Sequence, residues 1–264
     1  MQALLIDAGR RERKAETADL KFKEGSVQKR AILVDAMANQ VLVEICVESV
    51  DHAVAAESGG ADRIELCSDL CCGGVTPSQE LMLATRQQVR IPIHAMIRPR
   101  SGNFSYSAHE FETMKHEIDV AKEIGLDGIV LGLLDKNMQV DHARTRALAQ
   151  LAHPLPVTFH RAFDLCPDLT AALEAVIEAG TKRILTSGGK ARALDGLVNL
   201  AHLITTAGDR IVIMPGGGIR LANVERTVRS TGAREIHTSL DTSATVASRF
   251  EIKVSEFRRA VDKL

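Results

Sequence analysis

The stretch GGADRIEL, at residues 59–66, decides the fold class because close variants of it return three more times along the chain. The other copies are GLDGIVL at 125–131, GTKRILT at 180–186 and GAREIHT at 232–238. In each copy, glycine follows a helical pattern and a short apolar run follows the glycine. Glycine commonly ends an α-helix, and a short apolar run is typical of a buried strand. Each copy therefore predicts a helix, a glycine stop, a tight turn and a buried strand.

The same alternation extends over the chain from residue 41 onward. Eight apolar, β-branched runs start about 27 residues apart, which is the size of one strand-plus-helix unit. Such alternation implies parallel strands joined by right-handed crossovers, and eight strands close a (β/α)₈ barrel. We therefore predict a single-domain α/β TIM barrel over residues 41–264, preceded by a charged, flexible or partly helical extension over residues 1–40. The predicted strands are VLVEICV, RIELC, IPIHAMI, GIVLGLL, LPVTFH, KRILTS, RIVIMP and REIHTS.

Composition excludes several classes of function. The chain of 264 residues has a net charge of −1, which gives no electrostatic case for binding nucleic acid or an anionic membrane. No apolar run approaches the roughly 20 residues that span a bilayer, and the charged N-terminal segment does not resemble a signal peptide. We therefore expect a cytoplasmic protein whose five cysteines are reduced thiols.

The segment GGVTPS, at residues 73–78, predicts the start of the helix after the second strand. Gly73 and Gly74 supply a tight turn, and Thr76 is the predicted N-cap. Pro77 then takes the first helical position, where a missing N–H group costs nothing.

Polar residues stand where the predicted strands end, which is where (β/α)₈ barrels carry their sites. Buried strand ends normally carry Val, Ile or Leu, and burying charged groups is costly unless they are paired. We therefore predict a polar pocket whose candidate catalytic residues are Glu44, Glu65, Arg98, His160, Arg161 and Asp164. The alternative is a structural ion-pair network inside the barrel, for example between the two glutamates and the two arginines.

Two glycine-rich stretches, TSGGK at 186–190 and PGGGIR at 215–220, close the sixth and seventh predicted strands. Loops at this position of a barrel often present backbone N–H groups to a phosphate, although glycine also serves tight turns alone. Lys190 or Arg220 could assist such a site. The predicted anion-binding residues are Ser187, Gly188, Gly189, Gly216, Gly217 and Gly218.

Cys46 and Cys67 each follow a glutamate by two residues, on predicted neighbouring strands that would lie about 4.8 Å apart. Two inward thiolates at that spacing can share Cu(I), which prefers Cys and Met ligands, and Met96 would supply a thioether nearby. The alternative is that both cysteines are small buried hydrophobic residues. Cys71 and Cys72 are adjacent in a loop, and the spacings typical of zinc sites are missing from the sequence.

Longer motifs resemble the CutC copper-homeostasis family over roughly residues 42–240; they are EICVES, GGADRIELC, GGVTPS, MIRPRSGNFSYS, GLDGIVLGLL, LPVTFHRAFD, RILTSGG and IVIMPGGGI. The resemblance implies a (β/α)₈ barrel that forms cytoplasmic homo-oligomers, dimers or tetramers, and that is associated with copper tolerance and Cu(I) binding. It implies Cys46 and Cys67 as copper ligands. The polar set similar to the family's is Glu44, Arg63, Glu65, Arg98, His160, Arg161 and Asp164.

The chain departs from the family pattern at Ser101 and Asn103, where the family usually has Gly and Asp, so an acidic side chain is missing from that loop. Three hypotheses follow. The first is a copper-homeostasis protein that binds copper ion. The second is a (β/α)₈ enzyme acting on a small anionic or phosphorylated metabolite, with His160 or Glu65 as general acid or base and Arg98 or Arg161 as anion clamp. The third is an oligomeric scaffold with an ion-pair core.

Overall fold

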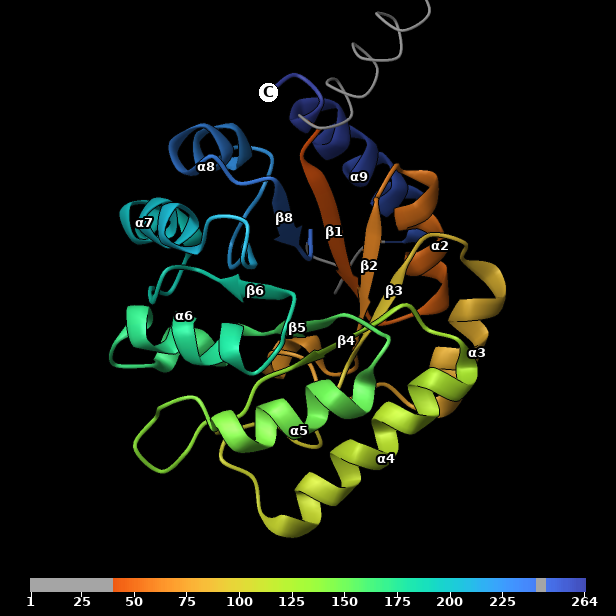
Figure 1. Ribbon diagram of the computed structural model, residues 1–264. Coiled ribbons are helices and arrows are strands. Elements are labelled where there is room, and N and C mark those ends of the chain that lie inside the picture. Colours follow the sequence, from red (N-terminus) through yellow and green to blue (C-terminus); the bar gives the residue numbers. More distant parts are fainter. Residues whose placement is uncertain (1–39, 241–245) are drawn as a thin grey trace, which may run out of the picture. The chain divides into compact units, whose positions relative to one another are not determined.

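The computed structural model describes residues 40–240 and 246–264, so the predicted extension over residues 1–40 lies outside the described part except for Gln40. Eight strands alternate with helices along the described chain, and all the paired strands run parallel (Figure 1). The strands are β1 (Leu42–Val47), β2 (Arg63–Leu66), β3 (Ile93–Met96), β4 (Gly128–Leu131), β5 (Val157–Phe159), β6 (Arg183–Thr186), β7 (Val212–Pro215) and β8 (Glu235–Thr238). The α-helices are α2 (Val50–Ser58), α3 (Gln79–Gln88), α4 (Ala108–Ile124), α5 (His142–Ala152), α6 (Leu169–Glu178), α7 (Leu197–Ala207), α8 (Val224–Thr231) and α9 (Ala247–Val261).

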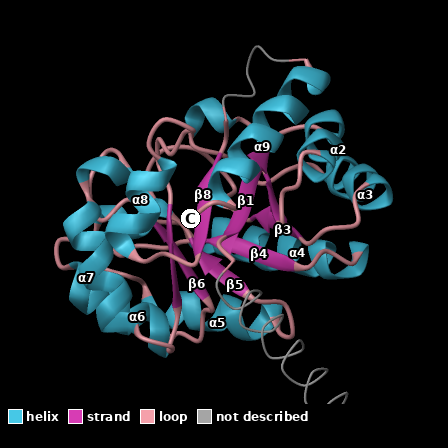
Figure 2. Cartoon of the chain, turned by 90° about the horizontal axis from the view of Figure 1, so that it is seen from above, coloured by secondary structure: helices cyan, strands magenta, loops and turns pink. Residues whose placement is uncertain are grey.

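The strands form a nearly closed barrel. They are hydrogen-bonded in the order β7-β6-β5-β4-β3-β2-β1-β8, and β7 and β8 pack side by side without a regular ladder. The helices form a ring around the strands when the barrel is seen from above (Figure 2). The predicted (β/α)₈ fold is confirmed. Within the described ranges, no helix is both long and apolar enough to cross a membrane.

The side chains of each strand alternate between two environments, as the pleat of a strand requires. On β1, Val43 and Ile45 belong to the large apolar core between the strands and the helices. Glu44 and Cys46 belong to the other face, which is the interior of the barrel. The interior holds a small separate apolar cluster of Cys46, Cys67, Met96 and Val130. The polar candidates therefore share the inside of the barrel with the two thiols.

The predicted turns are correct, but the predicted cap of α3 is wrong. Gly73 and Gly74 take positive φ angles of 87° and 80°, which only glycine adopts readily. The N-cap of α3 is Ser78, whose hydroxyl accepts a hydrogen bond from the backbone N–H of Leu81. The Thr76 hydroxyl instead accepts a hydrogen bond from the backbone N–H of Arg98 at 2.8 Å, which joins this loop to the segment that follows β3.

Candidate functional site

A cavity of about 660 Å³ opens at the carboxyl ends of the strands. Five of the six catalytic candidates line it, namely Glu65, Arg98, His160, Arg161 and Asp164. His237 of β8 lines it as well. Glu44 does not line it, because this residue comes earlier on β1 and its side chain is fully buried in the barrel interior. The cavity therefore lies where (β/α)₈ barrels carry their sites, at the carboxyl ends of the strands.

An ion-pair network surrounds Glu44. Its Oε2 accepts from Arg63 Nε at 2.5 Å, and its Oε1 lies 2.8 Å from His237 Nδ1. Glu235 continues the network, because its Oε2 lies 2.5 Å from both Arg63 Nη2 and Arg183 Nε. The ion-pair network considered from the sequence therefore exists, but Arg63 and Arg183 supply its cations. Arg98 and Arg161 take no part in it, because they lie nearer the mouth of the barrel.

The network sets the charge of the groups around it. Burial alone would raise the pKa of Glu44, but Arg63 and His237 outweigh burial and hold the pKa of this carboxyl well below its usual range. Burial raises the pKa of Glu65, although His237 opposes that shift. His237 itself has a raised pKa, because Glu65 and Glu44 outweigh the effect of its burial. Glu44 is thus held as a carboxylate, with a histidine between it and the second carboxyl group.

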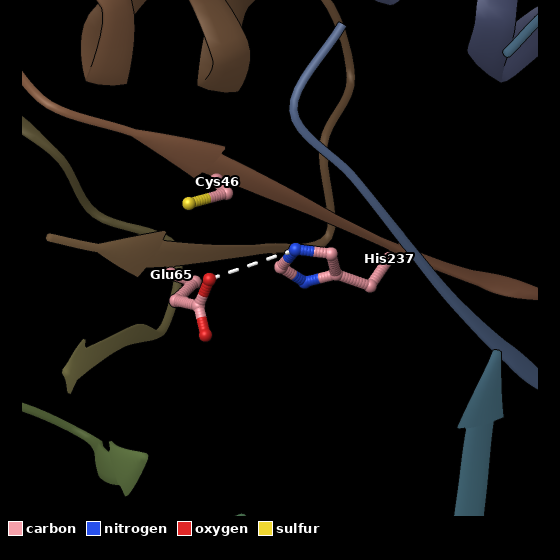
Figure 3. A group of neighbouring side chains, drawn as sticks. All are labelled: Cys46, Glu65 and His237. Carbon is pink, nitrogen blue, oxygen red and sulfur yellow. Dashed lines mark ion pairs between the residues drawn. The ribbon is translucent and has the colours of Figure 1, made fainter. Parts of the chain in front are cut away.

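Cys46, Glu65 and His237 form a cluster in the barrel, shown in Figure 3. They come from three neighbouring strands, β1, β2 and β8, and one ligand atom from each lies within 4.8 Å of the others. His237 Nε2 is 3.6 Å from Glu65 Oε2. Sequence reasoning did not single out His237. Strand alternation in REIHTS could have found it, because it shares a strand face with Glu235.

The two strand-end thiols lie together, as their positions predict. Cys46 Sγ and Cys67 Sγ are 3.5 Å apart, and both side chains are fully buried. The hydrogen bond to Cys67, burial and the nearby Glu65 all raise the pKa of Cys46 well above its usual value. Cys71 and Cys72 are exposed and belong to the loop after β2. The four thiols therefore do not form one cluster.

Two buried histidines, His94 and His160, each pack against a glycine. One glycine is in β4 and the other comes just after it. Burial lowers the pKa of His94 to about 3 and that of His160 to about 3. A methyl group added at Gly128 would lie 2.4 Å from the ring of His94, and one at Gly132 would lie 2.3 Å from the ring of His160. These glycines are therefore needed for room beside the rings.

Arg98 organises loops around the cavity. Its guanidinium donates to the carbonyl oxygens of Cys72, Gly74 and Gly102 at 3.1, 2.8 and 3.0 Å. It also stacks over the ring of Phe104 at 4.7 Å. These backbone contacts use both terminal nitrogens of Arg98, but its buried Nε–H has no hydrogen-bond partner among the described residues. The anion clamp predicted from the sequence therefore stays a prediction for this residue.

Asp164 holds the glycine-rich loop after β6. Its carboxylate accepts from Thr186 Oγ1 at 2.5 Å and from the backbone N–H groups of Ser187 and Gly189. The N–H of Gly188 donates to Thr186 Oγ1, and that of Gly216 donates to the carbonyl oxygen of Thr186. The geometry therefore does not support an anion at Ser187, Gly188, Gly189 or Gly216, because the chain already satisfies their amides.

We expect Asp164→Asn to lower the free energy of unfolding by about 2 kcal/mol. The amide keeps the shape of the carboxylate, but it loses the charge and turns an NH₂ group toward donors that now bond to oxygen. Urea unfolding measures the change. Asp195→Asn is the matched control, because Asp195 pairs with Arg192 on the solvent-exposed surface. It should lower the free energy of unfolding by less than about 0.5 kcal/mol. Equal effects of the two substitutions would contradict this role of Asp164.

Comparison with known proteins decides the family. The family model described as "CutC family" matches residues 41–242. The chain belongs to the CutC family. It is 50% identical over 202 residues to the human "Copper homeostasis protein cutC homolog", covering 76% of this chain and 74% of that one. It is 47% identical over 209 residues to a CutC family protein of Chromobacterium violaceum, covering 79% of this chain and 85% of that one.

A solved structure supports the same assignment. The CutC structure from Streptococcus agalactiae superposes with a TM-score of 0.73 at 31% identity. The match covers 76% of this chain and all of the other. The resemblance found in the sequence motifs is thus confirmed, and the barrel belongs to a CutC protein.

Proposed function

We propose that this CutC protein binds Cu(I) through Cys46 and Cys67 and acts in copper homeostasis. The observation that carries the proposal is the 3.5 Å contact between the two buried sulfurs. Thiolates are preferred ligands of Cu(I), and Met96, in the same buried cluster, offers a thioether. The names of the human and mouse relatives, copper homeostasis protein cutC homolog, support this role.

Glu65 and His237 would serve the same site by taking up protons. Both thiols must lose their protons when they bind a metal ion. The raised pKa of Cys46 shows that its surroundings favour the thiol, so copper must displace the proton. A Glu65 oxygen and a His237 nitrogen lie within 4.8 Å of Cys46 Sγ and of each other, close enough to receive it. Copper affinity should therefore rise with pH.

An anaerobic Cu(I) titration against a competing chelator tests the proposal. We expect the full chain to bind one Cu(I) tightly and the Cys46→Ser/Cys67→Ser double variant to lose that binding. Cys71→Ser/Cys72→Ser is the matched control, because it also removes two thiols but in an exposed loop, and it should bind copper like the wild type.

Thermal unfolding of each variant checks that the loss of binding does not come from loss of the fold. Undiminished stoichiometric binding by the folded Cys46→Ser/Cys67→Ser variant would refute the ligand assignment. Equal loss of binding in both double variants would refute it too, because the exposed thiols would then matter as much as the buried pair.

We also propose that the protein works in the cytoplasm as a homo-oligomer, a dimer or a tetramer. All five cysteines are free thiols, which supports a reducing compartment. A net charge of −1 supports neither nucleic acid nor an anionic membrane as a partner. Light scattering on the full chain would measure the oligomer size.

A further inference from the structure

We propose that the mouth of the barrel holds a second site, separate from the thiols, for the phosphate group of a small phosphomonoester. Gly217 and Gly218, in the loop after β7, would bind the phosphate together with Arg161 and Arg220. This site goes beyond copper binding and does not depend on it. It is narrower than the anion site expected from the sequence, because the amides of residues 187–189 and 216 are already used.

The backbone after β7 provides unused donors. Gly217 and Gly218 both line the cavity and take positive φ angles of 94° and 72°. Their carbonyl oxygens are already bonded, to the backbone N–H of Ala193 and to the side-chain amide of Asn223. Their own N–H groups have no acceptor in the part of the chain that the structure describes. Consecutive free N–H groups in a turn form a concavity that suits an anion.

Two guanidinium groups stand beside this turn. A methyl group added at Gly217 would lie 3.0 Å from Arg161 Cζ, so the guanidinium rests directly against the glycine. The Nε of Arg161 is bonded to Asp164, and its Nη2 is bonded to Ser187 Oγ and to the carbonyl oxygens of residues 190 and 191. Nη1, which lies 3.1 Å from the same methyl position, is the nitrogen left for an anion. Arg220 donates through Nη1 to the carbonyl oxygen of Ile219 and to Thr238 Oγ1, which fixes its head at the cavity wall. The nearby acid, Asp164, is occupied by the donors of the β6 loop and by Arg161. Asp164 offsets the charge of Arg161, whereas Arg220 has no acidic partner among the described residues, so Arg220 supplies the positive charge that favours an anion.

His160 gives an independent sign of a ligand. It lines the same cavity, and its side chain is buried with only 4% of the residue exposed. Its Nδ1 accepts from the backbone N–H of Ala162 at 3.2 Å, so in the neutral ring the proton sits on Nε2. That Nε2–H has no hydrogen-bond partner among the described residues. A buried donor without a partner is costly unless a ligand or water satisfies it.

The donor set fits a phosphate monoester better than a carboxylate. Two amides, two guanidiniums and an imidazole N–H belong to residues that line this one cavity, and phosphate presents more acceptor oxygens than a carboxylate. Arginine is also well suited to phosphate, because its fork can bind two oxygens. The cavity of about 660 Å³ is far larger than the phosphate group alone, so it has room for the organic part of a small metabolite.

Isothermal titration of the full, metal-free chain with ribose 5-phosphate tests the proposal. We expect saturable one-to-one binding that inorganic phosphate competes away and that ribose does not show. Arg220→Gln and Arg161→Gln should each weaken binding about tenfold or more. Arg229→Gln is the matched control, because Arg229 is exposed on α8 and pairs with Glu225, and it should leave the affinity unchanged.

Two variants keep the test decisive if one of them fails to fold. Equal affinity of the folded Arg220→Gln or Arg161→Gln variant and the control would overturn the site, as would no saturable binding by the wild type at millimolar ligand. The Cys46→Ser/Cys67→Ser variant should bind ribose 5-phosphate like the wild type. Failure of the copper proposal and failure of the phosphate site are therefore distinguishable.

Discussion

Glu44→Gln is expected to lower the free energy of unfolding by about 3–5 kcal/mol. Glu44 is completely buried and bonded to both Arg63 and His237. Glutamine nearly preserves the shape but removes the charge, so the buried Arg63 keeps only Glu235 as an acid partner. Removing one partner of a buried pair costs more than the pair contributes, because the other charge remains buried. Urea unfolding at neutral pH measures the loss.

Glu174→Gln is the matched control for this experiment. Glu174 also makes a two-bond pair with an arginine, Arg210, but both side chains are more than 40% exposed. Exposed pairs contribute about 0–1 kcal/mol, so the control should change little. If Glu44→Gln stays within about 1 kcal/mol of the wild type, the network is not a structural element of the barrel. It would then have to be explained by its effect on the site above it.

Below pH 6.5, the His160→Gln variant is expected to lose about 1.4 kcal/mol less free energy of unfolding than the wild type for each pH unit of acidification. Burial lowers the pKa of His160 to about 3, whereas the unfolded chain takes up the proton near pH 6.5. No penalty arises above pH 6.5, where both forms are neutral. Between pH 6.5 and about 3 only the unfolded form gains the proton, so wild-type stability falls as the pH falls.

His94 also makes the protein less stable as the pH falls, because burial lowers its pKa to about 3 as well. Glu65 opposes both, since a carboxyl with a raised pKa takes up its proton first in the folded state. The difference between variant and wild type therefore isolates His160. Urea midpoints at pH 7, 6 and 5 supply the measurement, with the exposed His109→Gln as control. Parallel pH profiles for His160→Gln and the wild type would contradict a buried neutral imidazole.

The fold could be predicted from sequence because its signals are local. Each of the four copies of the helix, glycine and strand pattern lies within a few residues, and the eight strand-plus-helix units leave few alternatives to a barrel. The cap of α3 could not be predicted in the same way. Thr76 suits a cap as well as Ser78 does, but its hydroxyl is bound to the backbone of Arg98, just after β3. Only the packed structure shows that competing partner.

The site was predicted in part for the same reason. Strand alternation alone brings Cys46 and Cys67 to one place, because each stands two residues after a glutamate on neighbouring strands. Strand alternation can mark His237 as sharing a face with Glu235, but it cannot predict the contact of His237 with Glu44, which is 193 residues away in the sequence. The sequence predicts that the backbone N–H groups of the loop after β6 are available to an anion. In the structure the carboxylate of Asp164, from a separate segment, accepts hydrogen bonds from those of Ser187 and Gly189. Pairings between distant segments decide which polar groups remain available.

X-ray absorption at the copper edge, on the full chain loaded anaerobically with one Cu(I), tests the central claim most directly. We predict a coordination shell of two sulfurs from Cys46 and Cys67, with or without the thioether of Met96, and we predict that this shell disappears in the Cys46→Ser/Cys67→Ser variant. A shell made only of nitrogen and oxygen atoms, or a sulfur shell that survives in the double variant, would contradict the account.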